Sequence, residues 1–252
     1  MESGHELLRL QQTLYESRSP TRRWLHCTRR DWIIAAIQRY LPAGEKKALE
    51  IGPGSGVYLP VLASLFDRVT ATDIEGTYLD HAQRLTDSYP NLTLLTDDIT
   101  HSKLADASFD MILCSEVIEH VPDSDGALHE MHRLLKPGGV LILSTPQRHS
   151  TLELVAKVAF MPGVVNCVKL IYREAILEMG HVSLMTEKQV RLRLKTSGFS
   201  IMECFKSGLY LPFIAEFMGK AGLRLESWLE SKLRPSPILS GLLWTQYFVA
   251  RA

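Results

Sequence analysis

Three glycines at alternate positions follow a short apolar run in the stretch ALEIGPGSG, residues 48–56. Glycine adopts positive φ easily and has no Cβ, so a turn of this kind lets a ligand approach the backbone closely. A helix that begins just after the turn directs its free N–H groups and its dipole toward the same place. Gly52, Gly54 and Gly56 therefore predict a nucleotide-binding turn between a strand and a helix.

Two carboxylates near this turn indicate which nucleotide it suits. Asp73 ends the next apolar run, where a carboxylate can accept hydrogen bonds from both ribose hydroxyls of an adenosine. Glu50 precedes the glycines, and its charge would repel a pyrophosphate but attract an ammonium group. Val57 stands where the dinucleotide fingerprint GxGxxG has its third glycine. The pattern therefore favours a ligand with adenosine at one end and an amino acid at the other.

At these residues the sequence resembles the class I S-adenosylmethionine-dependent methyltransferases, over about residues 45–147. Two further stretches, TDDITHSKLADASFDMILCSEVIEHV and MHRLLKPGGVLILSTP, resemble later motifs of that family in the same order. The resemblance implies that Glu50 and the glycines hold the methionine portion of the cofactor and that Asp73 holds its ribose. It also implies further cofactor-binding residues: Ile74 beside Asp73, Asp98 and Ile99 at the adenine, and Ser115 near the sulfonium.

The stretch SEVIEHV, residues 115–121, carries the groups that could assist methyl transfer. Glu116, Glu119 and His120 stand at i, i+3 and i+4, so one helical turn would place them on one face. Two carboxylates and an imidazole can bind a divalent metal such as Mg²⁺, which would lower the pKa of a hydroxyl group. The stretch resembles that of the ubiquinone-pathway O-methyltransferases and of the small-RNA 2′-O-methyltransferases, in which it is associated with metal-assisted O-methylation.

The same residues also have an interpretation without a metal. In many members of the wider family a similar Glu-His pair orders the loop or lies near the methyl acceptor. His120 would then have a direct or a positioning role in catalysis, with Glu116 and Glu119 as its companions. His181, in GHVSLMT, is a further candidate ligand or base.

Alternating β-rich runs and helical stretches from about Lys47 to Thr145 predict an α/β fold with a parallel sheet. The family resemblance implies a doubly wound, Rossmann-like sheet of seven strands, mostly parallel with a C-terminal antiparallel hairpin. The runs FSIMECFKSG and WTQYFVARA are the candidates for that hairpin.

Helical cap insertions surround this core, and the chain divides into four parts. Residues 1–44 form an N-terminal helical arm or lid, 45–150 the cofactor-binding core and 151–185 an apolar helical cap. Residues 186–252 form the last core helix and the hairpin, with a helical insert at 212–234. The basic, aromatic stretch 15–32 of the arm either contacts the cofactor carboxylate or an anionic substrate, or packs through its tryptophans. The two apolar inserts, 151–185 and 212–234, are expected to form a pocket for a hydrophobic acceptor, to lie on a membrane surface, or to serve as a packed cap or dimer interface.

The bulk composition excludes some classes of protein. With 28 basic and 28 acidic residues, the chain has no general electrostatic attraction for nucleic acid. Its four cysteines form no CxxC pair, which argues against a zinc ribbon and favours reduced thiols. The N-terminus does not resemble a secretory signal, and the apolar region 152–172 contains too many polar residues for a bilayer span. A cytoplasmic protein, with peripheral contact to a membrane as a further option, is expected.

The leading hypothesis is an S-adenosylmethionine-dependent methyltransferase that acts on a small, hydrophobic or lipid-like acceptor, with O-methylation favoured over methylation of carbon or nitrogen. An NAD(P)-dependent Rossmann oxidoreductase is the first alternative, and Glu50 and Val57 argue against it. A non-catalytic binding protein that keeps the fold is the second, and the intact glycines and strand-end carboxylates argue against that. RNA as the acceptor is a minor alternative, because the charge is neutral and no RNA-binding module is recognisable.

Overall fold

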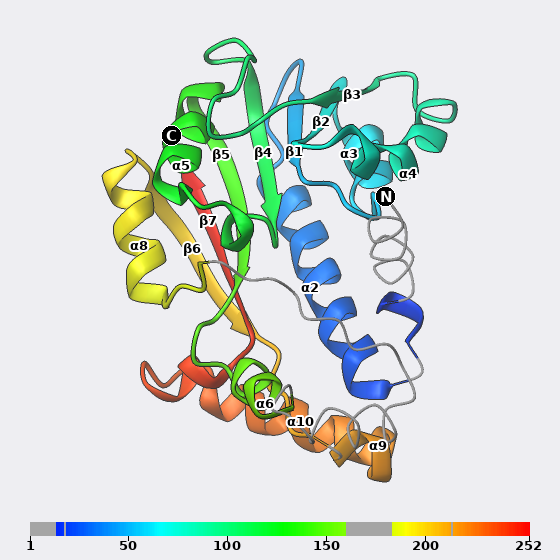
Figure 1. The fold of residues 1–252 in the computed structure, drawn as a ribbon, viewed down its shortest axis with the longest axis vertical. Coiled ribbons are helices and arrows are strands. Elements are labelled where there is room, and N and C mark those ends of the chain that lie inside the picture. The colour runs from blue at the N-terminus through cyan, green and yellow to red at the C-terminus, as the bar shows by residue number, and fades with distance from the viewer. Residues whose placement is uncertain (1–13, 18, 160–182, 213) are drawn as a thin grey trace.

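The computed structural model describes residues 14–17, 19–159, 183–212 and 214–252, and its centre is one seven-stranded sheet (Figure 1). The strand order is β3-β2-β1-β4-β5-β7-β6. Strand β7 is antiparallel to both neighbours, and the other six strands run in one direction. The predicted fold, a mostly parallel sheet with a C-terminal antiparallel hairpin, is confirmed. The strands are β1 (Lys47–Ile51), β2 (Arg68–Asp73), β3 (Leu92–Thr96), β4 (Phe109–Ser115), β5 (Leu135–Pro146), β6 (Ser200–Ser207) and β7 (Thr245–Arg251).

Strand β5 begins earlier than the sequence suggests. The residues KPGG at 136–139 are typical of a turn, but they lie within β5 as an irregularity. Phe109 of β4 pairs with Leu135, and Met111 pairs with Val140, so residues 136–139 bulge out of the ladder. Gly138 has a φ of 80°, which accommodates the bulge at little steric cost.

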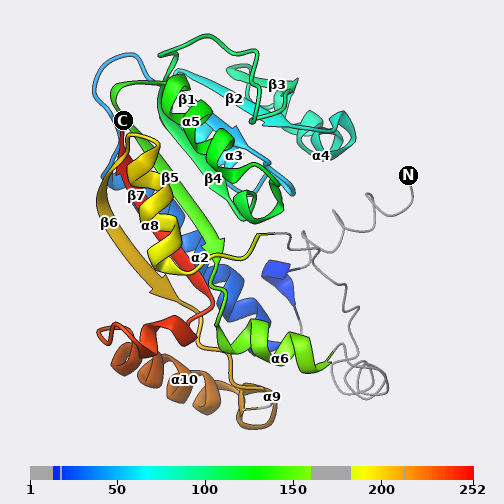
Figure 2. The same ribbon diagram turned by 60° about the vertical axis from the view of Figure 1, so that its left-hand side comes forward.

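Helices cover both faces of the sheet, as expected for a doubly wound fold (Figures 1 and 2). One apolar core packs α5 and α8 against the sheet, and a second packs α2, α3 and α4 against the other face. Thr186 and Gln189 form a capping box that fixes the start of α8. The helices are α2 (Pro20–Arg39), α3 (Leu59–Leu65), α4 (Gly76–Thr86), α5 (Ser124–Leu134), α6 (Thr151–Ala159), α8 (Glu187–Thr196), α9 (Ile214–Met218) and α10 (Lys220–Leu233), with 3₁₀ turns η1 (Leu14–Glu16), η2 (Ile118–His120) and η3 (Leu239–Leu242).

The N-terminal helix α2 is built into the core. Ile33 and Ile37 are completely buried against the sheet. Trp32 stacks on Phe205 with ring centres 5.7 Å apart, and its ring centre lies 4.5 Å from that of Tyr247. The stretch 15–32 was expected either to contact a ligand or to pack through its tryptophans, and Trp32 packs in the second way. Arg29 lies three residues before Trp32, near the middle of α2.

Two insertions extend the molecule at the edge where the parallel strands end (Figures 1 and 2). Helix α6 follows β5, and α9 and α10 lie between β6 and β7. The predicted apolar cap extends beyond α6 into residues 160–182, which lie outside the described residues, as does His181. Among the helices that the structure describes, none combines the length and the apolar character needed to cross a membrane.

Candidate active site

The glycine turn follows β1 directly and has the conformation expected of it. Gly52, Gly54 and Gly56 have φ values of 63°, 51° and 72°. A Cβ on Gly52 would lie only 2.5 Å from Cγ2 of Val117, so this position also lacks the space for a side chain. Positive φ and close packing together explain why the turn requires glycine.

Glu50, the penultimate residue of β1, is a buried carboxyl group with spare hydrogen-bonding capacity. The residue is 2% exposed, and its Oε2 has no hydrogen-bond partner in the described part of the chain. Burial raises the pKa of Glu50 to about 8. An unsatisfied buried carboxyl group costs free energy unless a ligand satisfies it. The ammonium group of an amino acid would do so, and this fits the methionine portion of S-adenosylmethionine.

Asp73 and Asp98 follow at the ends of the next two strands. Asp73 accepts a 3.4 Å hydrogen bond from the N–H of Glu75, and burial raises its pKa. Asp98 uses Oδ1 to accept from the N–H and the Oγ1 of Thr100, at 2.9 and 2.8 Å, and these bonds lower its pKa. Its Oδ2 has no hydrogen-bond partner among the residues described, which leaves an acceptor for an amino group such as that of adenine.

The apolar neighbours of these two carboxylates differ in burial. Ile74, next to Asp73, is 64% exposed, so its side chain is available to contact a ligand. Ile99, next to Asp98, is buried in the core. The structure therefore places the predicted cofactor residues along one edge of the sheet, at the ends of β1, β2 and β3.

Glu116 opens the second half of the site, immediately after β4. Its φ of 57° is unusual for a residue other than glycine, and its N–H donates to the carbonyl of Ser144 at 2.9 Å. The side chain accepts a 3.0 Å hydrogen bond from Oγ of Ser144 at Oε1. Its Oε2 forms an ion pair with Nη1 of Arg29 at 2.6 Å. Ser115, expected near the sulfonium, lies beside this network with its Oγ 3.0 Å from that of Ser144.

Arg29 is held in place by aromatic and polar neighbours. Its Nη2 lies 3.0 Å from Nδ1 of His26, and its guanidinium carbon lies 5.1 Å from the ring centre of Trp244. Burial and the nearby Arg29 charge lower the pKa of His26, so its neutral ring accepts a hydrogen bond from the guanidinium group. The sequence drew attention to the basic stretch around Arg29, but nothing in it predicted Glu116 as the partner.

Glu119 is completely buried in the 3₁₀ turn η2. Its Oε2 accepts a 2.9 Å hydrogen bond from Oγ1 of Thr145, and its Oε1 lies 4.0 Å from Nε2 of His120. Burial, reinforced by the neighbouring Glu116 charge, raises the pKa of Glu119 well above its usual value. The His120 side chain is partly exposed beside it. The structure thus joins these two residues as an adjacent carboxyl and imidazole.

The predicted Mg²⁺ site is not assembled. The i, i+3, i+4 spacing gathers three side chains only on an α-helix, whereas Glu116 has a positive φ and precedes a 3₁₀ turn of three residues. The Glu116 carboxylate is already paired with Arg29, and the Glu119 carboxyl accepts a hydrogen bond from Thr145. In the ranges that the structure describes, no three His, Cys, Asp or Glu side chains are grouped so that they could hold a metal ion. The described structure therefore gives no support to Glu116, Glu119 and His120 as metal ligands, and this assignment stays a prediction.

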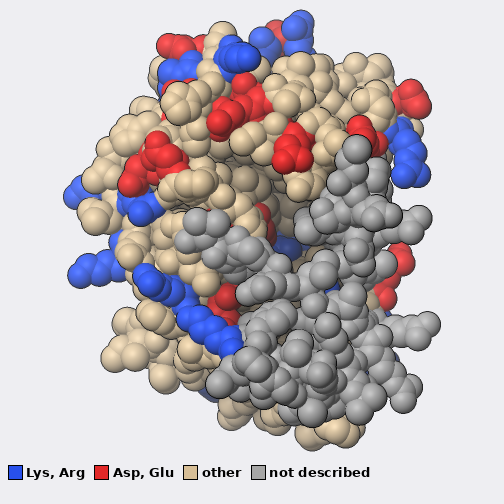
Figure 3. All heavy atoms as spheres, in the orientation of Figure 1, with Lys and Arg blue, Asp and Glu red and all other residues tan. Residues whose placement is uncertain are grey.

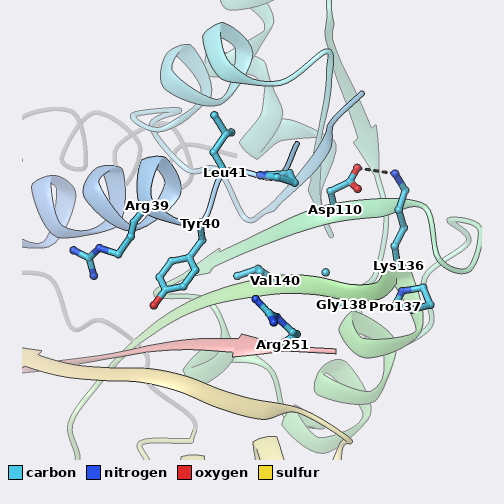
Figure 4. Close-up of a pocket in the computed structure, with 11 residues that line it drawn as sticks. Arg39, Tyr40, Leu41, Asp110, Lys136, Pro137, Gly138, Val140 and Arg251 are labelled. Atoms are coloured by element: carbon cyan, nitrogen blue, oxygen red, sulfur yellow. Dashed lines mark hydrogen bonds and ion pairs between the residues drawn. The ribbon is translucent and has the colours of Figure 1, made fainter. Parts of the chain in front are cut away.

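A hollow of about 360 Å³ lies away from all of these residues. It lies where β4 and β5 begin, at the opposite edge of the sheet from the glycine turn. Arg39, Lys136 and Arg251 line it, with Lys136 paired to Asp110 at 2.7 Å (Figure 4). Among the described residues, basic and acidic side chains are interspersed over the face drawn in Figure 3.

Comparison with known proteins agrees with this geometry. Residues 49–143 match the model of a methyltransferase domain family. The ubiquinone biosynthesis O-methyltransferase of Pseudomonas aeruginosa is 35% identical over 114 residues, which are 44% of this chain and 49% of that protein. The chain spans about half the length of the curated relatives it matches.

Solved structures with lower identity share the fold. The [4+2]-cyclase SpnF is 17% identical with a TM-score of 0.60, covering 88% of this chain and 80% of that one. Phosphoethanolamine N-methyltransferase 2 of Haemonchus contortus, solved with S-adenosyl-L-methionine, is 20% identical with a TM-score of 0.57, covering 88% and 52%. Since a cyclase and an N-methyltransferase both have this fold, the reaction depends on the site residues. Residues 49–143 therefore match a methyltransferase domain, and the strand order and the glycine turn agree with that match.

Proposed function

We propose that this chain transfers a methyl group from S-adenosylmethionine to the oxygen of a small, hydrophobic acceptor. The observation that carries the proposal is the buried Glu50 carboxyl, whose Oε2 lacks a partner in the described structure, beside a glycine turn and two strand-end carboxylates. When bound, the cofactor would supply an activated methyl group. The protein then has to bind the cofactor, orient the acceptor and take up a proton.

The cofactor would lie along the ends of β1, β2 and β3. Glu50 would bind its ammonium group, Asp73 its ribose hydroxyls and Asp98 its adenine amino group, with Ile74, Ile99 and the three glycines around it. Charged groups make hydrogen bonds that are worth more than neutral ones, so the three carboxylates would supply much of the affinity and specificity. Ser115 would lie between the cofactor and the second half of the site.

Glu119 and His120 would take up the acceptor proton. A hydroxyl group is a weak nucleophile until its proton has moved to a base, and an imidazole suits that role near neutral pH. In this proposal the hydroxyl proton moves to the imidazole ring of His120, and the adjacent Glu119 helps to orient that ring.

Two observations support a lipid-like acceptor that is methylated on oxygen. The relatives named ubiquinone biosynthesis O-methyltransferases favour oxygen as the methylated atom and a lipid-like acceptor. The insertions α6, α9 and α10 lie at the edge of the sheet where the strands end and where the acceptor would enter. A lipid-like acceptor resides in a bilayer, so the proposal includes peripheral contact with a membrane.

Isothermal titration with S-adenosylhomocysteine, a probe of cofactor binding, tests the proposal. We expect micromolar affinity in the wild type, a large loss in Asp73→Ala and no change in Asp80→Ala, which alters an exposed carboxylate on α4. Methyl transfer to a panel of small phenols and hydroxyquinones would then test the acceptor. A folded protein that does not bind S-adenosylhomocysteine would contradict the proposal at its first step.

A further inference from the structure

Helix α10 directs its acidic side chains inward, the reverse of an ordinary surface helix. Gly222, Glu226 and Glu230 recur at every fourth residue and are all buried. Glu230 accepts hydrogen bonds from the N–H groups of Gly208 and Leu209, at 2.8 and 3.1 Å, and pairs with Arg234. The buried face is therefore fixed by specific contacts, which also determine what the opposite face presents.

The outward face of α10 is basic and apolar. Arg224, Trp228 and Lys232 also recur at every fourth residue, offset by two from the buried set, so they lie on the opposite side of the helix. All three are exposed, Trp228 by 56%. Leu225 and Lys220 are also exposed on α10. Both glutamates of this helix are buried, so the exposed charges that α10 contributes are positive.

Further exposed apolar side chains lie close in sequence on both sides of α10. Met218 ends α9, and Ile238 and Leu239 follow α10, with Ile238 85% exposed. Of the eleven large apolar side chains exposed in the described part of the chain, six fall between residues 217 and 239. A Cβ on Gly222 would lie 2.6 Å from the carbonyl oxygen of Ile214, so α9 and α10 are in close contact. The two helices thus form one rigid unit.

We propose that this unit, residues 214–239, docks on an anionic phospholipid bilayer. Exposed tryptophan and leucine beside lysine and arginine are typical of helices that lie in the membrane interface. Negative lipid headgroups complement the positive charges of α10. A second copy of the chain fits less well, because a symmetric contact through this face would bring the same positive charges together.

The docking surface lies at the end of the molecule where the acceptor would enter. Helices α9 and α10 connect the end of β6 to the start of β7, at the edge where the six parallel strands end (Figures 1 and 2). The idea that docking helps the acceptor to enter rests on the proposed function. The binding of vesicles does not depend on it.

Flotation with lipid vesicles tests the proposal on the full chain. We expect the wild type to bind vesicles that contain phosphatidylglycerol, to bind pure phosphatidylcholine vesicles weakly, and to lose binding as salt is added. Arg224→Gln and Lys232→Gln should each lower the partition coefficient about fivefold, and Trp228→Ser should lower it by a similar factor or more. Lys188→Gln and Leu192→Ser are the matched controls, since they alter exposed basic and apolar residues on α8.

Each outcome decides the proposal. Loss of binding in the α10 variants but not in the α8 controls supports it. The proposal is overturned if the wild type does not bind anionic vesicles, or if all variants bind them equally. It is also overturned if the wild type is a dimer that does not bind vesicles and that Trp228→Ser dissociates. Titration of each variant with S-adenosylhomocysteine shows whether the core is intact. A wild type that binds vesicles but not this ligand would keep the docking surface and contradict the proposed function.

Discussion

The two halves of the site differ in where their residues find partners. At the ends of β1, β2 and β3, the carboxylates bond locally or not at all: Asp98 to Thr100, Asp73 to Glu75, and Glu50 Oε2 to no group in the described structure. At the end of β4, the carboxylates bond to distant residues, Glu116 to Arg29 and Glu119 to Thr145.

This difference separates side chains that can still bind a ligand from side chains that are already bonded within the protein. The first half leaves acceptor atoms available to a ligand, so its residues should affect cofactor affinity most. The second half is already connected by hydrogen bonds and an ion pair, so its residues should affect the shape and chemistry of the acceptor side. The following predictions test that division, beginning with the largest effect.

Removing the proposed base should affect turnover alone. We expect His120→Asn to lower kcat by about 10²–10³-fold, because general-base assistance typically contributes that much. Its affinity for S-adenosylhomocysteine should match that of the wild type, and the rise of kcat with pH should disappear. His129→Asn, which alters an exposed histidine on α5, is the control. A variant that keeps the pH profile of the wild type would show that His120 is not the base.

Removing a strand-end carboxylate should affect affinity first. Asp73→Ala should weaken S-adenosylhomocysteine binding about 100-fold, as expected for the loss of two hydrogen bonds to a charged group. Calorimetric titration measures this change, with Asp80→Ala as the control. If Asp73→Ala lowered kcat without changing affinity, the division between the two halves would fail.

Breaking the buried ion pair should destabilise the fold. Arg29→Met leaves Glu116 without its cation and should lower the free energy of unfolding by about 3 kcal/mol. The double variant Arg29→Met/Glu116→Gln removes both charges and should recover most of that loss. Denaturant unfolding measures all three proteins. A double variant as unstable as Arg29→Met would show that packing, rather than charge pairing, gives Arg29 its role.

Glu50 should make stability depend on pH. Its folded pKa of about 8 exceeds the ordinary value of 4.5, so the folded state retains a proton that the unfolded state has lost between these two values. Stability from this group is present below about pH 4.5 and is lost as the pH rises toward 8. Glu50→Gln should remove that loss and gain roughly 2–4 kcal/mol over the wild type at pH 8. Thermal unfolding across this pH range tests the difference.

The same Glu50→Gln variant should bind S-adenosylhomocysteine more weakly, because an amide attracts an ammonium group less than a carboxylate does. Greater stability with lower affinity is the combination expected of a buried ligand-binding charge. If stability and affinity both fell, Glu50 would instead be a structural residue.

The smallest effect is expected from metal removal. Arg29 already neutralises Glu116, so chelation with EDTA should leave kcat unchanged, and added Mg²⁺ should not restore activity to His120→Asn. Activity measured before and after chelation checks this. A loss of activity that Mg²⁺ reverses would mean that the Arg29–Glu116 pair opens during the reaction.

Much of the cofactor half could be predicted from the sequence because its signals are local. Glycines at alternate positions and acids at strand ends follow from turn geometry and from strand length. The seven-stranded sheet and its C-terminal antiparallel hairpin came from the family resemblance, and the structure confirms them. Strand β5 differs, since KPGG is typical of a turn and lies in the strand only because the residues on either side of it, Leu135 and Val140, pair with neighbouring strands.

The acceptor half depended on contacts across the chain. The sequence alone determined the types and spacing of Glu116, Glu119 and His120, and the α-helical turn that would have gathered them was a reasonable expectation. Only the tertiary structure decided that Glu116 has a positive φ and that its charge is paired with Arg29, 87 residues earlier in the chain. The physical reason is that a local spacing defines a site only when the backbone is regular, whereas a buried charge takes whichever opposite charge the fold brings to it.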